Sequence, residues 1–343
     1  MRRRKVLGPP EVTYSAVMRA ILVVNPQATS TTAGGRDVLA HALASQVKLD
    51  VVETDYRGHA MAVARSAARD GIDLVVAHGG DGTVNEVVNG LLADVAPAGA
   101  PPLAGGSATR TPARRGPAAA GQVPALGVVP GGSANVFARA LGISADSFEA
   151  THQLLNALEN DRSRRVGLGL ADGHWFTFNA GLGWDADVVG RVAKRRGKQT
   201  TAGLYLRAAV RSYFRPPLGR PALTIHVPGE EPAEALTAFV SNTDPWSYLG
   251  ERAIHLNPGC SFETGLGLFA LNGLGLPTVF KHVRQALATK SNQRGRRLVR
   301  HDDLPMIRID AAEPVNFQVD GDLVGQRTRV EFSSVPNALT VIV

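Results

Sequence analysis

Residues 72–86 read Ile-Asp-Leu-Val-Val-Ala-His-Gly-Gly-Asp-Gly-Thr-Val-Asn-Glu, an apolar run followed by a glycine-rich turn. The apolar run predicts a buried β-strand, and after Thr83 the apolar residues recur at the spacing of one helix face: Val84, Val87, Val88, Leu91 and Leu92. Three glycines between strand and helix let the backbone approach a ligand closely. The helix start directs unpaired N–H groups and the positive dipole end at that ligand. This stretch therefore predicts a phosphate-binding loop.

Asp81 lies inside this glycine loop. A carboxylate there would repel a phosphate unless a cation lies between them, which suggests Mg²⁺. A second glycine turn, Pro130–Asn135, follows the predicted strand 125–129 and opens another helix. Ser133 in that turn is suited either to cap the helix or to bind a phosphate oxygen, and the residues leave both roles open.

The composition is that of a globular chain long enough for two domains, with 343 residues, 44% of them hydrophobic and 20% charged. A net charge of +7 favours anionic partners, although a general richness in arginine explains it equally well. The single cysteine, Cys260, fits a reducing cytoplasm. No apolar run approaches the roughly 18 residues of a membrane span. Residues 1–17 are expected to form a disordered basic tail, with Met18 as an alternative start.

Strands alternate with helices in the first half of the chain. Strands are predicted at 20–24, 49–54, 72–77 and 125–129, and helices at 35–46, 58–69 and 83–93. This alternation predicts a parallel sheet with helices on both faces. Ligands of such sheets bind at the carboxyl ends of the strands, where Asn25, Thr54 and the loop Gly79–Thr83 all fall. Residues 96–122, rich in Ala, Pro and Gly, are expected to be a disordered insertion.

From about residue 164 the pattern changes to short β-branched and aromatic runs separated by Gly, Pro and Asn, which predicts an antiparallel β-sandwich. Its strands are predicted at 174–180, 221–227, 235–241, 266–271, 306–310, 314–319, 328–332 and 338–343. Helical stretches are expected around 185–213 and 277–290. We therefore predict an N-terminal doubly wound parallel-sheet nucleotide-binding domain over 18–163. A C-terminal antiparallel β-sandwich domain with short helices follows over 164–343, and its final strand could return to the first domain. Gly181–Ala186 imitates a dinucleotide fingerprint, but no βαβ unit surrounds it, so a nicotinamide cofactor is rejected.

Near the end of the chain, Asp320-Gly321-Asp322 follows a predicted strand and places two acids two residues apart. Asp-Gly is a common pair in hairpin turns. By themselves, these residues favour a turn over a catalytic site.

An ordered series of motifs resembles the diacylglycerol kinase and sphingosine kinase superfamily of lipid kinases. The series consists of Asn25-Pro26, Gly79–Thr83, Pro130–Asn135, Asn179–Ala186 and Asp320–Asp322. The glycine-rich Asp motif alone is shared with NAD kinases and phosphofructokinases, so the order of the whole series carries the resemblance. It covers residues 19–343 and implies a kinase domain, a β-sandwich domain for the lipid substrate, and an active cleft between them.

The resemblance implies an ATP-dependent lipid kinase that transfers the γ-phosphate to a hydroxyl of diacylglycerol or a related amphiphilic lipid. The implied ATP site contains Asn25, Thr54, Gly79, Gly80, Asp81, Gly82, Thr83 and Ser133. The implied Mg²⁺ is organised by Asp81 and, through water, by Asp320. Asp322 is the implied general base, so the implied catalytic residues are Asp322, Asp320 and Asp81. A positioned carboxylate is what an attacking alcohol needs to lose its proton.

Two departures from the family pattern stand out. Many relatives carry Glu at the position of Asp322, so the carboxylate here is one methylene shorter. Around residues 261–268, where many relatives carry several acids, this chain has only Glu263. We therefore do not expect the structural Mg²⁺ site of some bacterial members there.

Basic residues gather in two stretches, 191–198 and 281–300. They suit either a solvated helix face or an anionic membrane surface, to which a cytoplasmic lipid kinase would bind peripherally at the inner face. Nucleic acid is not an expected partner, because aromatic residues are only 6% and no recognition motif occurs. A homodimer is possible. Two alternatives to a lipid kinase remain: a kinase of a soluble acceptor such as NAD, and a non-catalytic regulator that binds nucleotide or membrane.

Overall fold

The computed structural model describes residues 18–95, 123–184, 186–188, 222–288 and 291–343. The predicted basic tail at 1–17, the insertion at 96–122 and the basic cluster at 191–198 lie outside the described residues, as does nearly all of the predicted helical stretch 185–213. Among the helices that are described, none has the length and apolar character needed to cross a membrane.

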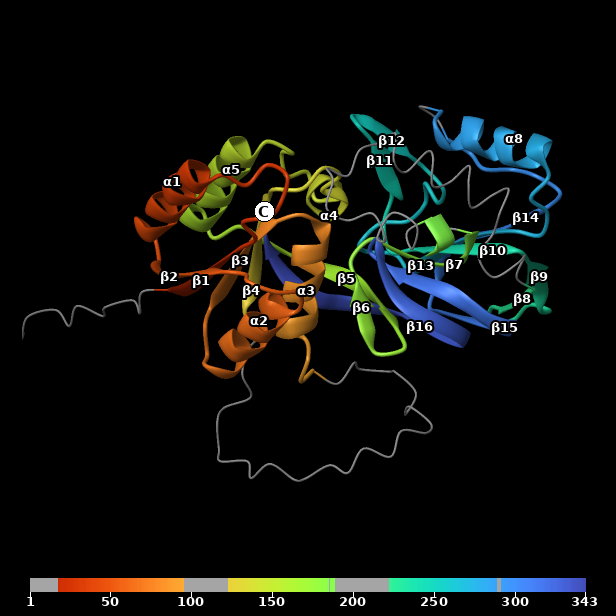
Figure 1. Cartoon of the computed structure of the whole chain (residues 1–343), viewed down its shortest axis with the longest axis horizontal. Helices are drawn as coiled ribbons and strands as arrows, with labels where there is room; N and C mark the ends of the chain where they lie inside the picture. Colours follow the sequence, from red (N-terminus) through yellow and green to blue (C-terminus); the bar gives the residue numbers. More distant parts are fainter. Residues whose placement is uncertain (1–17, 96–122, 185, 189–221, 289–290) are drawn as a thin grey trace, which may run out of the picture.

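The first half of the chain alternates strands and helices, as the sequence predicts. Its elements are β1 (Arg19–Val24), α1 (Ala33–Ala44), β2 (Lys48–Glu53), α2 (His59–Arg69), β3 (Leu74–Gly79), α3 (Asp81–Leu91), β4 (Ala125–Pro130), α4 (Val136–Ala140) and α5 (Ser147–Glu159). The four strands pair in parallel in the order β2-β1-β3-β4. Helices α1 and α5 lie on one side of this sheet and α2 and α3 on the other (Figure 1).

The central strand β3 is buried along its whole length. Since helices cover both faces of a parallel sheet, such a strand is a continuous apolar run instead of an alternating one. The loop after β2 is fixed by a charged hydrogen bond, because Gly58 N–H at the start of α2 donates to Glu86 Oε1 of α3 at 2.9 Å. The carboxyl edge of the sheet therefore has a defined shape.

The second half of the chain is rich in antiparallel strands. Its elements are β5 (Ser163–Ala171), β6 (His174–Phe176), β7 (Asn179–Gly183), β8 (Leu223–His226), β9 (Ala233–Ala235), β10 (Thr237–Ser241), β11 (Ser247–Leu249), β12 (Arg252–Ile254), β13 (Leu266–Leu271), α8 (Leu276–Ala286), β14 (Leu298–Leu304), β15 (Met306–Val319) and β16 (Asp322–Ile342). Antiparallel pairing runs in the order β14-β13-β10-β7-β15-β16. The predicted fold class, a doubly wound parallel sheet followed by an antiparallel β-sandwich, is confirmed as a parallel half and an antiparallel β-rich half.

Three details differ from the predicted elements. The separate strands predicted at 306–310 and 314–319 form the single strand β15, with a shift of register between Asp310 and Val315. The strands predicted at 328–332 and 338–343 are likewise parts of β16. Helix α5 and the strands β5, β11, β12 and β14 were not predicted. The buried face of α5 consists largely of small or polar residues: Ala150, Thr151, Leu154 and Ala157.

Strand β16 contributes to both hydrophobic cores. Its first part pairs with β15 and places Val330 and Phe332 in the core of the antiparallel half. Its last part places Leu339 and Val341 in the core of the parallel half, where Val341 pairs in parallel with Leu126 of β4. Among the described strands, fourteen therefore form one continuous hydrogen-bonded sheet that runs through both halves.

The buried end of β16 should stabilise the parallel half. Val341 is fully buried, and Val341→Ala should lower the free energy of unfolding by about 2 kcal/mol, because it removes packed methyl groups from a closed core. Urea denaturation monitored by circular dichroism measures the change. The matched control is Val51→Ala on β2, where the valine is 45% exposed. Equal stability of the two variants would contradict the joint role of β16.

Candidate active site

Two glycine loops meet at the carboxyl edge of the parallel sheet. Gly131 N–H donates to the carbonyl oxygen of Gly79 at 2.7 Å. A Cβ atom on Gly132 would lie 2.6 Å from the Cα of Gly80, closer than real side chains tolerate. Only glycine at these positions lets the loops touch, so the two motifs separated by about 50 residues in sequence form one concave backbone surface.

The contacting loops have the features of a phosphate site. Helix α3 begins at Asp81, and its N-cap residue, Gly80, has no side chain to satisfy the first N–H groups. The hydroxyl of Thr31 is buried and has no hydrogen-bond partner among the described residues. It lies 2.7 Å from where a Cβ on Gly131 would be, so it borders the same surface. Unpaired donors around a glycine-lined hollow fit phosphate oxygens.

Asn25 fixes the turn after β1 to the start of α3. Its side-chain amide donates to Thr83 Oγ1 at 3.1 Å, and its backbone N–H donates to the carbonyl of His78 at 2.9 Å. Thr54 lies at the end of β2, where its N–H donates to the carbonyl of Val24. Within the described residues, neither the Thr54 nor the Ser133 side chain hydrogen-bonds to the glycine loops, so their implied contacts with ATP stay predictions.

The capping role considered for Ser133 is wrong. Ser133 is exposed, and α4 begins three residues later at Val136, with Asn135 as its N-cap residue at a φ of 48°. The carboxylate of Asp81 takes this place, because its Oδ1 accepts a hydrogen bond from Phe137 N–H at 3.3 Å. Asp81 therefore links the start of α3 to the start of α4.

The environment of Asp81 favours its neutral form. The pKa of Asp81 is raised to about 6, chiefly by burial and in part by charge repulsion from the carboxylate of Asp320. The N–H groups of Val136 and Phe137 oppose this rise. The structure thus brings the acid of the glycine loop close to the first acid of the late Asp-Gly-Asp turn, although 239 positions separate them in sequence.

The Asp320–Gly321 pair forms the tight turn of the β15–β16 hairpin, as the Asp-Gly pair in the sequence predicts. Both residues have positive φ, 46° and 77°, as two-residue hairpin turns require, and Val319 pairs with Asp322 across the turn. Asp320 is 4% exposed. The first residue of this turn is therefore buried between the two halves of the protein, in contrast to that of an ordinary surface hairpin.

The carboxylate of Asp320 accepts five hydrogen bonds. Oδ2 accepts from the N–H of Thr177 at 2.7 Å, from its hydroxyl at 2.8 Å, and from Asn85 Nδ2 at 2.8 Å. Oδ1 accepts from the N–H groups of Phe178 at 3.0 Å and Asn179 at 3.1 Å. A carboxylate has about four lone-pair sites. Such a saturated group favours a structural role for Asp320 over the implied contact with water and Mg²⁺.

Two asparagines of α3 were missed as functional candidates. Asn85 Nδ2 donates to Asp320 and also to the carbonyl of Trp175 at 2.9 Å. Asn89 pairs with both backbone groups of Trp175, at 3.0 Å each. These residues lie four positions apart beside the apolar stripe of α3. The sequence shows this spacing, but it does not show that both amides bind the backbone of Trp175.

Asp322 lies opposite the start of α3. Its Oδ2 atom is 3.5 Å from where a Cβ on Gly82 would be, and 3.5 Å from Nη2 of Arg57. Arg57 is a further residue that the sequence did not single out, although a basic residue shortly after Thr54 falls at the carboxyl edge of the sheet. The structure thus brings together the glycine loops, Asp81, Asp320 and Asp322.

No group of three or more His, Cys, Asp or Glu within the described ranges is arranged to hold a metal ion. Glu263 instead forms an ion pair with Arg164, whose hydrogen bond lowers the pKa of Glu263. Mg²⁺ is commonly held by one or two carboxylates together with substrate phosphates. Asp81, at the phosphate-binding loops, fits such a shared site, whereas the saturated Asp320 does not.

Comparison with known proteins agrees with this geometry. Residues 19–169 match the diacylglycerol kinase catalytic domain family. The diacylglycerol kinase of Bacillus subtilis (strain 168) is 36% identical over 131 residues, which cover 38% of this chain and 33% of that protein. A Chromohalobacter salexigens protein named "Probable lipid kinase YegS-like" is 39% identical over 132 residues, with the same coverage of 38% and 33%. Residues 19–169 are therefore similar to the diacylglycerol kinase catalytic domain.

The likeness beyond residue 169 is one of fold. A crystal structure of a diacylglycerol kinase from Bacillus anthracis str. Sterne matches with a TM-score of 0.66 at 19% identity, over 96% of this chain and 97% of that one. The sequence matches, by contrast, cover only about a third of the two curated relatives. The comparisons thus show a family match for residues 19–169 and a likeness of fold over nearly the whole chain.

The raised pKa of Asp81 predicts a pH-dependent stability in protein free of nucleotide and metal. The pKa of Asp81 is higher in the folded protein than in the unfolded chain, so the protonated form favours the folded state. Its contribution to the free energy of unfolding is therefore fully present below about pH 4 and is lost as the pH rises through about 6. Asp81→Asn should remove this loss and increase stability at pH 7.5 by about 1–3 kcal/mol. Urea denaturation across pH 4–8 in EDTA tests this.

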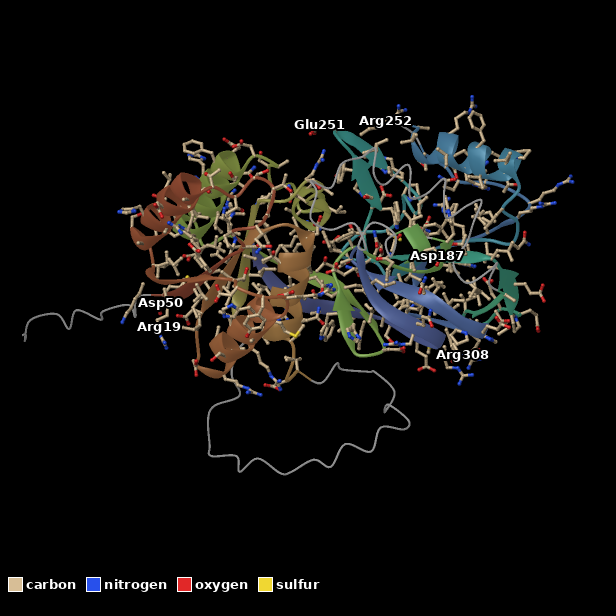
Figure 2. All side chains as sticks on the ribbon, viewed as in Figure 1. Arg19, Asp50, Asp187, Glu251, Arg252 and Arg308 are labelled. Carbon is tan, nitrogen blue, oxygen red and sulfur yellow. The ribbon has the colours of Figure 1, made fainter. Side chains whose placement is uncertain are left out.

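The control for Asp81→Asn is Asp50→Asn, which changes an exposed carboxyl on β2 (Figure 2). This control should leave the pH profile of the wild type unchanged. A pH profile for Asp81→Asn that matches the wild type, or a loss of stability at pH 7.5, would contradict the assigned environment.

Proposed function

We propose that this protein is an ATP-dependent lipid kinase that transfers the γ-phosphate to a hydroxyl of diacylglycerol or a related amphiphilic lipid. The observation that carries the proposal is the approach of Asp322 Oδ2 to the start of α3, 3.5 Å from the Cβ position of Gly82. A carboxylate beside a phosphate-binding helix start is the arrangement that phosphoryl transfer to an alcohol requires. The family of residues 19–169 supports the same reaction class.

The backbone of the two glycine loops would hold the phosphates of ATP. The first N–H groups of α3 are oriented towards the site, and the buried Thr31 hydroxyl supplies a further donor beside Gly131. Asp81 would hold Mg²⁺, which supplies charge neutralisation at the phosphates when bound. Asp81 also keeps α4 in place through Phe137 N–H, so the loops stay in contact.

Asp322 would take the proton of the attacking lipid hydroxyl. It is partly exposed, with a side-chain exposure of 29%, so an alcohol in the site can reach it. Because Gly82 has no side chain, the short Asp carboxylate can come close to the phosphates without the extra methylene of Glu. Arg57, 3.5 Å from the same carboxylate, would pair with negative charge that develops during transfer.

Asp320 and Asn85 would act by positioning. The five hydrogen bonds to Asp320 fix the turn that carries Asp322, and Asn85 connects this turn to α3, which carries Asp81. Neither residue needs to touch the substrates for this purpose.

The proposal predicts that Asp322→Asn abolishes most of the turnover. With labelled ATP, Mg²⁺ and mixed micelles of diacylglycerol, ceramide, sphingosine or monoacylglycerol, the wild type should transfer label to an organic-phase product. The loss of the base should reduce kcat by about 10²–10⁴-fold while ATP affinity changes little. The matched control, Glu313→Gln, changes an exposed acid of β15 and should keep full activity.

Three outcomes would contradict the proposed function. Folded, ATP-binding protein that labels none of these lipids would exclude the lipid kinase and favour a non-catalytic regulator. A label that stays wholly in the aqueous phase would favour a soluble acceptor. Full activity of Asp322→Asn would remove Asp322 from the reaction.

The contact between the loops predicts a specific loss of nucleotide binding. In Gly132→Ala the new methyl group would press on the Cα of Gly80, so the loops must separate and ATP affinity should fall about tenfold or more. Gly34→Ala is the control, because a Cβ there meets nothing within 4 Å. Isothermal titration calorimetry with ATP measures both, and equal affinities would show that the loop contact does not shape the site.

A further inference from the structure

Helix α8 exposes an apolar stripe to solvent. Leu276, Phe280 and Val283 are 60%, 73% and 47% exposed, and their spacing of four and three residues places them on one face of the helix. The buried residues of the same helix, His282 and Ala286, are each 4% exposed and face the core. Three large apolar side chains in a row on the outside of a helix are more than scattered surface hydrophobicity.

Lysine and arginine side chains border this apolar stripe, and no acidic residue lies near them in the sequence. The sequence has no Asp or Glu between Glu263 and Asp302. Five exposed basic residues lie on α8 or on the loop after it: Lys281, Arg284, Arg294, Arg296 and Arg297. None of these five forms an ion pair with another residue in the described part of the chain.

The loop that carries three of these arginines is attached to α8. Gln293 Oε1 contacts His282 Nδ1 at 3.1 Å, and Arg294 N–H donates to Gln285 Oε1 at 3.3 Å. The C-terminal end of the helix is also fixed by Arg252, whose guanidinium donates to the carbonyl of the C-cap residue Leu287 at 2.7 Å. Figure 2 shows Arg252 beside the end of α8, at the turn end of the β11–β12 hairpin. Stripe and cations therefore form one firmly held surface.

We propose that α8 and residues 294–297 form a docking surface for anionic phospholipid bilayers. An interfacial helix has an apolar face that enters the acyl boundary and cations that pair with headgroup phosphates, and α8 has both. The single sign of charge fits a phospholipid surface better than the mixed surface of a protein partner. Figure 1 shows α8 at the outer edge of the antiparallel half, away from β1–β4. The proposal rests on the proposed function, since a lipid kinase must reach a substrate in a membrane.

Vesicle sedimentation in the absence of nucleotide tests the surface. The wild type should bind vesicles of phosphatidylglycerol and phosphatidylcholine, and bind phosphatidylcholine vesicles much less. Phe280→Ser with Val283→Ser, and separately Lys281→Gln with Arg284→Gln, should each weaken binding to the anionic vesicles about tenfold or more. The matched control is Phe148→Ser on α5, because Phe148 is also 73% exposed and should not affect binding.

The two variants distinguish this surface from non-specific attraction. Full binding by both folded double variants, or an equal loss in Phe148→Ser, would overturn the proposal, and so would a wild type that binds no vesicles. Activity on short-chain diacylglycerol in detergent micelles is measured in parallel, and it should be unchanged in the α8 variants. Intact micellar activity without vesicle binding refutes the docking surface alone, whereas vesicle binding without any kinase activity refutes the proposed function alone.

Discussion

The Asp320 carboxylate accepts hydrogen bonds from both halves of the chain, and the candidate site depends on this single group. Three backbone N–H groups and a hydroxyl come from residues 177–179, and one amide comes from Asn85 of α3. Hydrogen bonds to a charged group are each worth about 1.5–3 kcal/mol, and the loss of their acceptor would leave buried donors unpaired. They hold Asp320 in a left-handed conformation, and so Asp322, two residues later, is held opposite the glycine loops.

Two further constraints make the site a property of the whole fold. Strand β16 begins at Asp322 in the antiparallel half and ends beside β4 in the parallel half. The glycine loops touch through backbone alone, which sets the shape of the surface at the start of α3. A change in either the long strand or the loop contact would therefore shift the acid and the phosphate-binding surface relative to each other.

The sequence predicts most of the fold because its strongest signals are local. A buried parallel strand such as β3 is a continuous apolar run, and glycines mark the turns. Helix α5 was not predicted because small and polar residues form most of its buried face, so the sequence shows no apolar stripe there. At the site, the motif order identifies Asp81 and Asp322, but Thr31, Arg57 and Asn85 are not identified, since their importance arises only from partners distant in sequence. The sequence could not test the implied metal contact of Asp320, because the five hydrogen bonds to its carboxylate come from residues that only the fold brings together.

The account is tested most directly by a crystal structure of the protein with Mg²⁺ and a non-hydrolysable ATP analogue. It predicts that the terminal phosphate lies against the backbone N–H groups at the start of α3, with the carboxylate of Asp322 on the far side of that phosphate and Asp320 still bound to residues 177–179. A nucleotide bound elsewhere, or a terminal phosphate that Asp322 cannot reach by any closure of the two halves, would contradict it.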